Sequence, residues 1–139
     1  MLHALYNKPM PSLIMNYTVD QARNAIARLD NGFRGFYGPA TVNSIGCKIP
    51  RKAGHRGRVK VKVNGRKEYY CYHVAVVAVG RGSELKKISK VGEVYEASHT
   101  CKNKSCYNPD HVAVEPQEVN RSRERCQIAA CKHTPKCIN

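Results

Sequence analysis

The 139-residue chain has the length of one domain, but it holds few of the large aromatic residues that build a core. With no Trp and only two Phe, the apolar core should be modest, so further cross-links are expected to stabilise it. Lys and Arg number 24 against 10 Asp and Glu, and the net charge of +14 favours a polyanionic partner, nucleic acid first, over a merely well-solvated surface.

The first predicted element is a helix that begins after Thr18. Thr18 and Gln21 have the spacing of a capping box, and Gly32 supplies the stop. Apolar residues recur along one face of this helix, at Val19, Ala22, Ile26 and Leu29. The next stretch, residues 32–44, is rich in Gly and Pro and is predicted to form a loop.

Residues 58–72 are predicted to form a β-hairpin. Basic residues and valines alternate from Arg58 to Val63, and Asn64-Gly65 is the strongest short signal for a hairpin turn. A two-residue turn would set Lys62 opposite Lys67. It would leave one face apolar, with Val59, Val61, Val63 and Tyr70, and the other basic, with Arg58, Lys60, Lys62, Lys67 and Tyr69. Like charges opposite one another cost stability, and a polyanion would relieve that cost.

The remaining elements form a strand–loop–strand–helix series. Residues 73–79 are apolar throughout, and their length does not decide between a buried strand and a buried helix; residues 80–83 end this segment. Residues 91–99 and 111–115 read as strands separated by a loop with a turn at Asn108-Pro109. Pro116 then opens a helix that is expected to reach about Arg125.

Five of the seven cysteines stand with histidines at metal-ligand spacing. The first cluster is Cys101-x4-Cys106-x4-His111, and the second is Cys126-x4-Cys131-x-His133-x3-Cys137. Tetrahedral zinc takes four such ligands, so the second cluster is complete and the first needs one more, from Cys47 or Cys71. Both zinc ions are expected to be structural, because four protein ligands leave no open position for water.

A secreted, disulfide-stapled toxin is the alternative explanation of the cysteines. It would contain disulfides and no zinc. Against it stand the odd number of cysteines, the histidines at ligand spacing and the start of the chain, where Lys8, Pro9 and Pro11 break a mildly apolar stretch too short for an export signal or a membrane span. We therefore expect an intracellular, reducing compartment with thiolates on zinc, and no membrane partner.

The C-terminal third resembles a known nuclease family. The strand–loop–strand–helix order, with His99 near the end of the first strand and Asn120 on the helix, resembles the His-Me finger (ββα-metal) nuclease core. The segment 97–111, followed by Asn120 and the cluster at 126–137, resembles the His-Cys box of homing endonucleases. The likeness is dense over residues 94–137, and upstream only Gly46–Pro50 and the hairpin correspond loosely.

The resemblance implies an α+β fold with an antiparallel β-ribbon, a ββα-metal core and two structural zinc sites. It implies a domain at residues 41–139, preceded by an N-terminal helix and loop extension at residues 1–40. It also favours Cys47 as the fourth ligand of the first zinc, because the residues around Cys47 resemble the upstream cysteine position of the family.

The resemblance further implies Mg²⁺-dependent hydrolysis of DNA. His99 would be the general base, and Asn120 would bind a single catalytic Mg²⁺ or Mn²⁺. Histidine has a suitable pKa, and the cation would neutralise charge on the phosphate. A backbone carbonyl, of Ala97 or Ser98, would orient His99. Arg66 is the nearest candidate for the active-site arginine of the family.

Double-stranded DNA is the expected partner. A ribbon of two strands fits the major groove, and arginines that follow Asn120 on the helix can hold backbone phosphates. The residues assigned to DNA contacts are Arg58, Lys60, Lys62, Lys67 and Tyr69 on the hairpin, with Arg121 and Arg123 on the helix. Family members act as homodimers, which cut both strands, whereas a monomer would nick one. The rival function is a zinc-stabilised DNA- or RNA-binding protein without catalysis.

Overall fold

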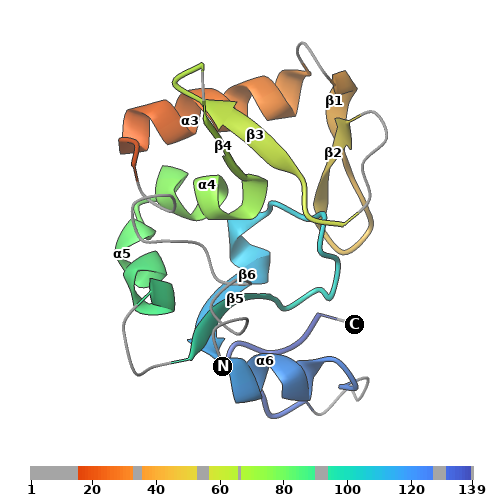
Figure 1. Ribbon diagram of the computed structural model, residues 1–139. Helices are drawn as coiled ribbons and strands as arrows, with labels where there is room; N and C mark the ends of the chain where they lie inside the picture. Colours follow the sequence, from red (N-terminus) through yellow and green to blue (C-terminus); the bar gives the residue numbers. More distant parts are fainter. Residues whose placement is uncertain are drawn as a thin grey trace.

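Pairs of antiparallel strands alternate with helices along the chain (Figure 1). The computed structural model describes residues 16–32, 36–52, 57–65, 67–89, 94–126 and 131–138. Over these residues the strands form three two-stranded sheets, so the predicted α+β class is confirmed. Within the same residues, none of the helices combines the length and the apolar character needed to cross a membrane.

Helix α3 (Val19–Asn31) begins and ends where the sequence predicts. The Thr18 hydroxyl accepts from the Gln21 amide at 3.1 Å, and the Gln21 side chain accepts from the Thr18 amide at 2.8 Å. Gly32 ends the helix with a φ of 78°, which favours glycine. The buried face differs slightly from the prediction, because Ala25 is fully buried while Val19 is 38% exposed.

The prediction of a loop at residues 32–44 is partly wrong, because the middle of this stretch forms a strand. Strand β1 (Phe36–Val42) pairs antiparallel with β2 (Lys48–Lys52), with Thr41 opposite Ile49. Two register shifts interrupt the pairing on either side of Gly38. Such irregular pairing breaks the period-two pattern, so the Gly- and Pro-containing strand gives no clear signal in the sequence.

The hairpin is present, but its predicted register is wrong. Asn64 and Gly65 have positive φ values of 61° and 77°, as an Asn-Gly turn requires. Strand β3 (Lys60–Val63) pairs with β4 (Lys67–Tyr70) so that Val63 faces Lys67, which leaves three residues in the turn instead of two. One extra residue shifts every cross-strand partner.

The corrected register changes which side chains the hairpin exposes. Lys62 faces Glu68 instead of Lys67, so the expected repulsion between two lysines does not arise. Tyr69 faces Val61, is only 6% exposed and packs edge-on against Tyr17, with ring centroids 4.7 Å apart. The prediction that Tyr69 contacts DNA is therefore wrong, since its ring belongs to the core. Arg66 lies outside the described residues.

The undecided apolar segment is a helix. Helix α4 (Cys71–Ala78) is buried along its whole length, as expected of a helix that is apolar on every side. It begins two residues before the expected segment, so Cys71 and Tyr72 are helical rather than part of the hairpin strand. Two short helical turns follow that the sequence did not indicate, α5 (Gly82–Leu85) and the 3₁₀ helix η1 (Lys86–Ser89).

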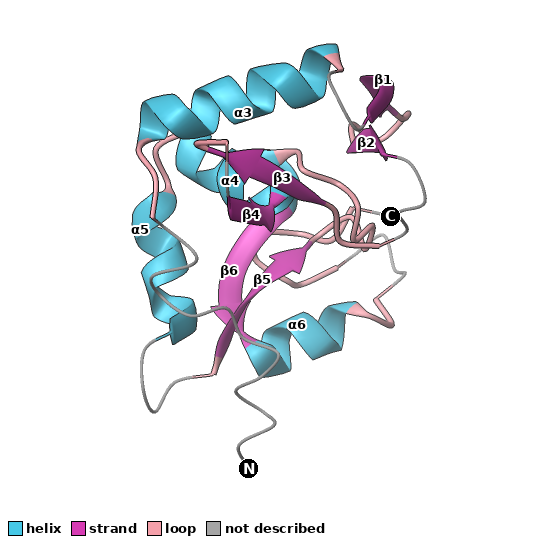
Figure 2. Ribbon diagram, turned by 45° about the horizontal axis from the view of Figure 1, so that its top comes forward, coloured by secondary structure: helices cyan, strands magenta, loops and turns pink. Residues whose placement is uncertain are grey.

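The predicted strand–loop–strand–helix series is confirmed. Strand β5 (Tyr95–His99) pairs antiparallel with β6 (Val112–Pro116), and the 3₁₀ turn η2 (Pro109–His111) precedes β6. Helix α6 (Gln117–Arg123) lies against both strands, at the opposite end of the molecule from α3 (Figure 2). Helix α6 begins beside the N-terminal half of β5, where the Gln117 amide donates to the Val94 carbonyl and the Asn120 side chain donates to Glu96.

A buried ion pair joins α6 to β6. The guanidinium of Arg123 donates to both carboxylate oxygens of Glu115, at 2.6 and 2.8 Å, and its remaining terminal nitrogen donates to the Pro135 carbonyl at 2.7 Å. Arg123 is 1% exposed. The prediction that Arg123 contacts DNA is therefore wrong, because its donors are used inside the protein.

Replacing Arg123 by Met should strongly destabilise the protein. The carboxylate of Glu115 would stay buried without its partner, which costs about 3 kcal/mol or more. Urea unfolding at a fixed zinc concentration measures the change. Arg121→Met, on the exposed side of the same helix, is the matched control and should change the free energy of unfolding by less than about 0.5 kcal/mol. Equal stability of the two variants would contradict the assignment.

Candidate metal centres and active-site cleft

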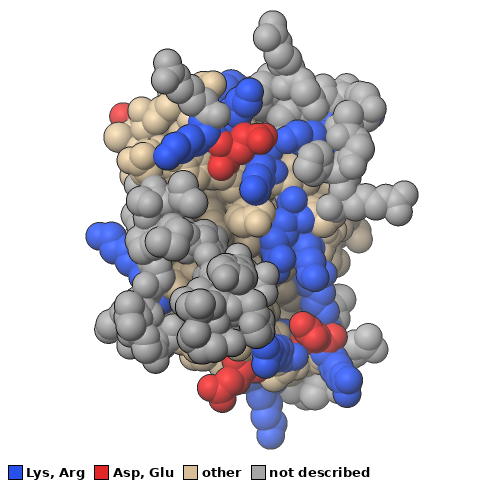
Figure 3. Space-filling model, viewed as in Figure 1, with Lys and Arg blue, Asp and Glu red and all other residues tan. Residues whose placement is uncertain are grey.

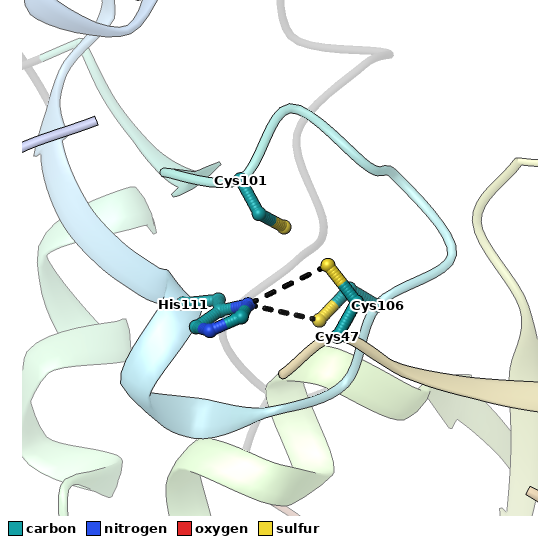
Figure 4. A group of neighbouring side chains, drawn as sticks. All are labelled: Cys47, Cys101, Cys106 and His111. Carbon is teal, nitrogen blue, oxygen red and sulfur yellow. Dashed lines mark hydrogen bonds between the residues drawn. The ribbon is translucent and has the colours of Figure 1, made fainter. Parts of the chain in front are cut away.

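The first Cys/His cluster is assembled from three separate parts of the chain. Cys47 precedes β2, Cys101 and Cys106 lie in the loop after β5, and His111 ends η2 (Figure 4). Their four donor atoms all lie within 4.8 Å of one another, and all four residues are buried. Nδ1 of His111 is 3.7 Å from the Cys47 sulfur and 3.6 Å from the Cys106 sulfur, so it is this ring nitrogen that faces the thiols.

Backbone contacts hold Cys47 against the later loop. Gly46 adopts a φ of 90°, and a Cβ there would approach Nε2 of His111 to 3.5 Å. The side-chain Nδ2 of Asn108 donates to the Gly46 carbonyl at 2.7 Å, and the backbone amide of Tyr107 donates to the Lys48 carbonyl at 2.9 Å. Cys71, the other candidate ligand, is instead buried in the hydrophobic core at the start of α4.

The donor set of this cluster fits a zinc ion. Three sulfurs and one imidazole nitrogen are the ligands of closed structural sites. A hydrogen bond from Cys101 lowers the pKa of Cys106 to about 5, while the Cys106 sulfur raises the pKa of Cys101. The first thiolate therefore forms readily, and further thiolates at this distance need a cation to offset their mutual repulsion.

The second cluster combines Cys126, Cys131, His133 and Cys137, again with all donor atoms within 4.8 Å. Nδ1 of His133 lies 3.1 Å from the Cys131 sulfur. Its Nε2 lies 2.7 Å from the Ser122 hydroxyl, which itself donates to the Val119 carbonyl at 2.6 Å. The hydroxyl can then only accept from Nε2, so the ring proton is on Nε2 and Nδ1 keeps a lone pair for a metal. This donor set also fits zinc.

His99 lies at the end of β5 in a fixed orientation. Its Nε2 is 3.1 Å from the Cys106 carbonyl, which can only accept, so Nε2 carries the proton and Nδ1 is left as the basic nitrogen. The expected carbonyl of Ala97 or Ser98 is therefore not the one that orients this ring. Burial, together with the charge of Arg58, lowers the pKa of His99 to about 4, so the imidazole is neutral at neutral pH.

His99 and Asn120 line the same cleft, which has a volume of about 600 Å³. The side chain of Asn120 reaches it from α6, and its amide nitrogen donates to Glu96 at 2.9 Å. Because that nitrogen is bonded, the carboxamide oxygen is the atom left to bind a cation. The cleft is otherwise mostly polar, with Arg58, Glu96, Lys102, Lys104, Gln117, Arg121 and Glu124 among its lining residues.

Among the described residues of the hairpin region, Arg58 is the arginine that lines the cleft. The sequence assigns it to the DNA groove, but the structure places it in the cleft with His99. The charge of Arg58 acts on the ring of His99 and on that of Tyr72, whose centroid is 4.5 Å from that of His99. Ser105 donates to the Gly57 carbonyl at 2.6 Å and so ties this segment to the loop of the first cluster. Arg58 and His99 come close only because this contact folds the chain back on itself. No pattern of neighbouring residues in the sequence could have indicated it.

Exposed basic side chains extend beyond the cleft. Lys60, Lys62 and Lys67 are exposed on the hairpin, and Arg121 is exposed on α6. Figure 3 shows Lys and Arg side chains along a band that runs from the region of β3 and β4 toward α6. The cleft and these residues together form a basic surface suited to a polyanion.

Comparison with known proteins gives one family. The family described as the zinc-binding loop region of homing endonuclease matches residues 46–139. The matched range begins just before Cys47 and includes both clusters, His99 and Asn120. Neither a curated protein nor a solved structure matches the chain.

Cys47→Ala should remove one bound zinc ion, whereas Cys71→Ala should not. The two substitutions make the same change at two buried thiols, and only Cys47 lies within 4.8 Å of the other donors of the first cluster. Zinc content of the purified variants, measured by elemental analysis, distinguishes them. Loss of zinc in Cys71→Ala, with full zinc in Cys47→Ala, would reverse the assignment of the fourth ligand.

Proposed function

This chain belongs to the family of the homing endonuclease zinc-binding loop region, and on that basis we propose that it is an endonuclease that hydrolyses double-stranded DNA with the help of a divalent cation. The observation that carries the proposal is the pairing of His99 and Asn120 in one cleft, with the basic nitrogen of His99 fixed by the Cys106 carbonyl. A base and a cation ligand in one polar cleft suit the hydrolysis of a phosphodiester.

His99 is the general base of the proposed reaction. Nδ1 takes a proton from a water molecule as the water oxygen attacks phosphorus, and the bond from phosphorus to the 3′-oxygen breaks. The departing 3′-oxygen takes a proton from solvent water, so the products are a 5′-phosphate and a 3′-hydroxyl. The neutral state of the ring supports this role, because a protonated imidazole could not accept the proton.

Asn120 would hold the cation by its carboxamide oxygen. Mg²⁺ or Mn²⁺ prefers oxygen ligands and retains most of its waters, so one amide oxygen and the phosphate oxygens suffice. When bound, the cation stabilises the charge on the phosphate and on the departing 3′-oxygen. Because Arg58 lines the same cleft, we propose that it donates to a phosphate oxygen there, the role expected of Arg66 from the family resemblance.

Both zinc ions are structural in this proposal. Each cluster supplies four protein ligands, which leaves no position for water or substrate. The first zinc would also hold the loop whose Cys106 carbonyl orients His99. A reducing, intracellular compartment would keep the thiols available, and all seven cysteines, which are all described, are free of disulfides.

Alanine in place of His99 should abolish cleavage without abolishing DNA binding. Loss of the general base lowers the rate by about 10²–10⁴-fold. The assay incubates supercoiled plasmid with wild type and the variant, with and without Mg²⁺, and follows binding by electrophoretic mobility. Nicked product would indicate a single acting copy, and linear product would indicate a homodimer. DNA binding without cleavage by the wild type would favour a non-catalytic DNA- or RNA-binding protein.

The double variant Lys60→Ala/Lys62→Ala should weaken DNA binding at all sequences alike. Both ammonium groups are exposed on the face of β3 that carries no buried side chains. Each phosphate contact that is lost should reduce the slope of log K against log salt by about 0.9, so the expected change is about 2. Lys86→Ala/Lys87→Ala, on η1, is the control with the same charge change. An unchanged slope in the hairpin variant would contradict its DNA contact.

A further inference from the structure

The carboxylate of Glu96 lines the cleft but has no role in the reaction proposed above. One of its carboxylate oxygens accepts from the Asn120 amide at 2.9 Å, and the other lies 3.3 Å from the Gln117 amide. Both donors come from α6, one turn apart, so the carboxylate is held by two neighbouring side chains of the helix that carries the cation ligand.

The surroundings of Glu96 differ from those of its cross-strand partner. Glu96 lies directly opposite Glu115 in the β5–β6 pair, where two like charges would destabilise the sheet. Glu115 is neutralised by the guanidinium of Arg123. The hydrogen bonds to Glu96 come from two uncharged amides, which leave its negative charge in place.

A carboxylate is unfavourable in a cleft that receives a phosphate. The cleft also contains basic residues suited to an anion, Arg58, Lys102, Lys104 and Arg121, and the carboxylates of Glu96 and Glu124 work against them. Of these two carboxylates, Glu96 is the one that is bonded to Asn120. A divalent cation between the carboxylate and the phosphate would reverse this, since it is attracted to both. Carboxylate oxygens are also preferred ligands of Mg²⁺ and Mn²⁺.

We propose that Glu96 is part of the divalent-cation site, where it acts with Asn120. Its carboxylate turns the Asn120 carboxamide so that the oxygen is available to the cation, and its charge raises the affinity of the site. This inference rests on the proposed function for the identity of the site, but its test does not require cleavage.

The test compares Mn²⁺ binding by the zinc-loaded full chain and its variants. Binding is measured by electron paramagnetic resonance, in which free Mn²⁺ gives the signal. Glu96→Gln keeps the shape and an acceptor oxygen but removes the charge, and it should weaken Mn²⁺ binding about tenfold or more. Glu96→Asp keeps the charge and should bind more tightly than Glu96→Gln. Glu118→Gln, which removes a charge from an exposed position of α6 outside the cleft lining, should bind as wild type does.

Zinc content and thermal melting of each variant establish that the fold is retained. If Glu96→Gln binds Mn²⁺ as tightly as the wild type, the inference is wrong, while the nuclease function stands if the wild type cleaves DNA. If Mn²⁺ binding depends on Glu96 but the wild type does not cleave, the cation site stands and the nuclease function fails. If the wild type binds no Mn²⁺, both proposals fail.

In the cleavage assay, a cation-binding role has a distinct signature. Glu96→Gln should require about tenfold more Mg²⁺ for half-maximal rate and approach the wild-type rate at saturation. A reduced rate that excess Mg²⁺ does not restore would contradict a role in cation affinity.

Discussion

Cys106 contributes both to the first metal cluster and to the orientation of His99. Its sulfur belongs to the first cluster, and its backbone carbonyl accepts the hydrogen bond that orients His99. Two features fix where this carbonyl points: the cluster that holds the Cys106 sulfur, and the hydrogen bond from the Tyr107 amide, in the same planar peptide unit, to the Lys48 carbonyl. A metal ion bound in the cluster would help to set the orientation of His99 without touching it, as outer groups do at many metal sites.

The second cluster is connected to the same core by a different interaction. Arg123 bridges Glu115 on β6 to the carbonyl of Pro135 in the C-terminal segment, and Ile138 donates to Thr100 beside the first cluster. The C-terminal segment is therefore bonded to the ββα unit at two places, at Arg123 of α6 and at Thr100 just after β5. In a chain with a modest apolar core, these polar and metal-type connections supply rigidity that side-chain packing alone would not.

The apolar core borders the cleft, because Ala97 belongs to both. It joins α3, the valine face of the hairpin and the whole of α4. Tyr72, on α4, extends from this core to His99 and Arg58, so packing in the upper half of Figure 1 reaches the candidate active site. Hydrophobic packing thus holds Tyr72, the hydrogen bond from Ser105 to Gly57 holds the segment of Arg58, and the Cys106 carbonyl orients His99.

The sequence by itself determined the local features of this protein. The cap at Thr18, the Asn-Gly turn, the ββα order and the ligand spacing of the clusters all depend on neighbouring residues, and each was found in its predicted place. The β-hairpin register, the irregular strand β1 and the helical state of residues 71–78 were decided by tertiary structure.

The interactions that define the site also required the tertiary structure. The burial of Tyr69 and Arg123, the proximity of Arg58 to His99 and the contact between Glu96 and Asn120 join residues far apart in the chain or depend on a shift of one residue. A sequence pattern reports spacing along the chain, whereas burial and charge neutralisation depend on which segments meet in space.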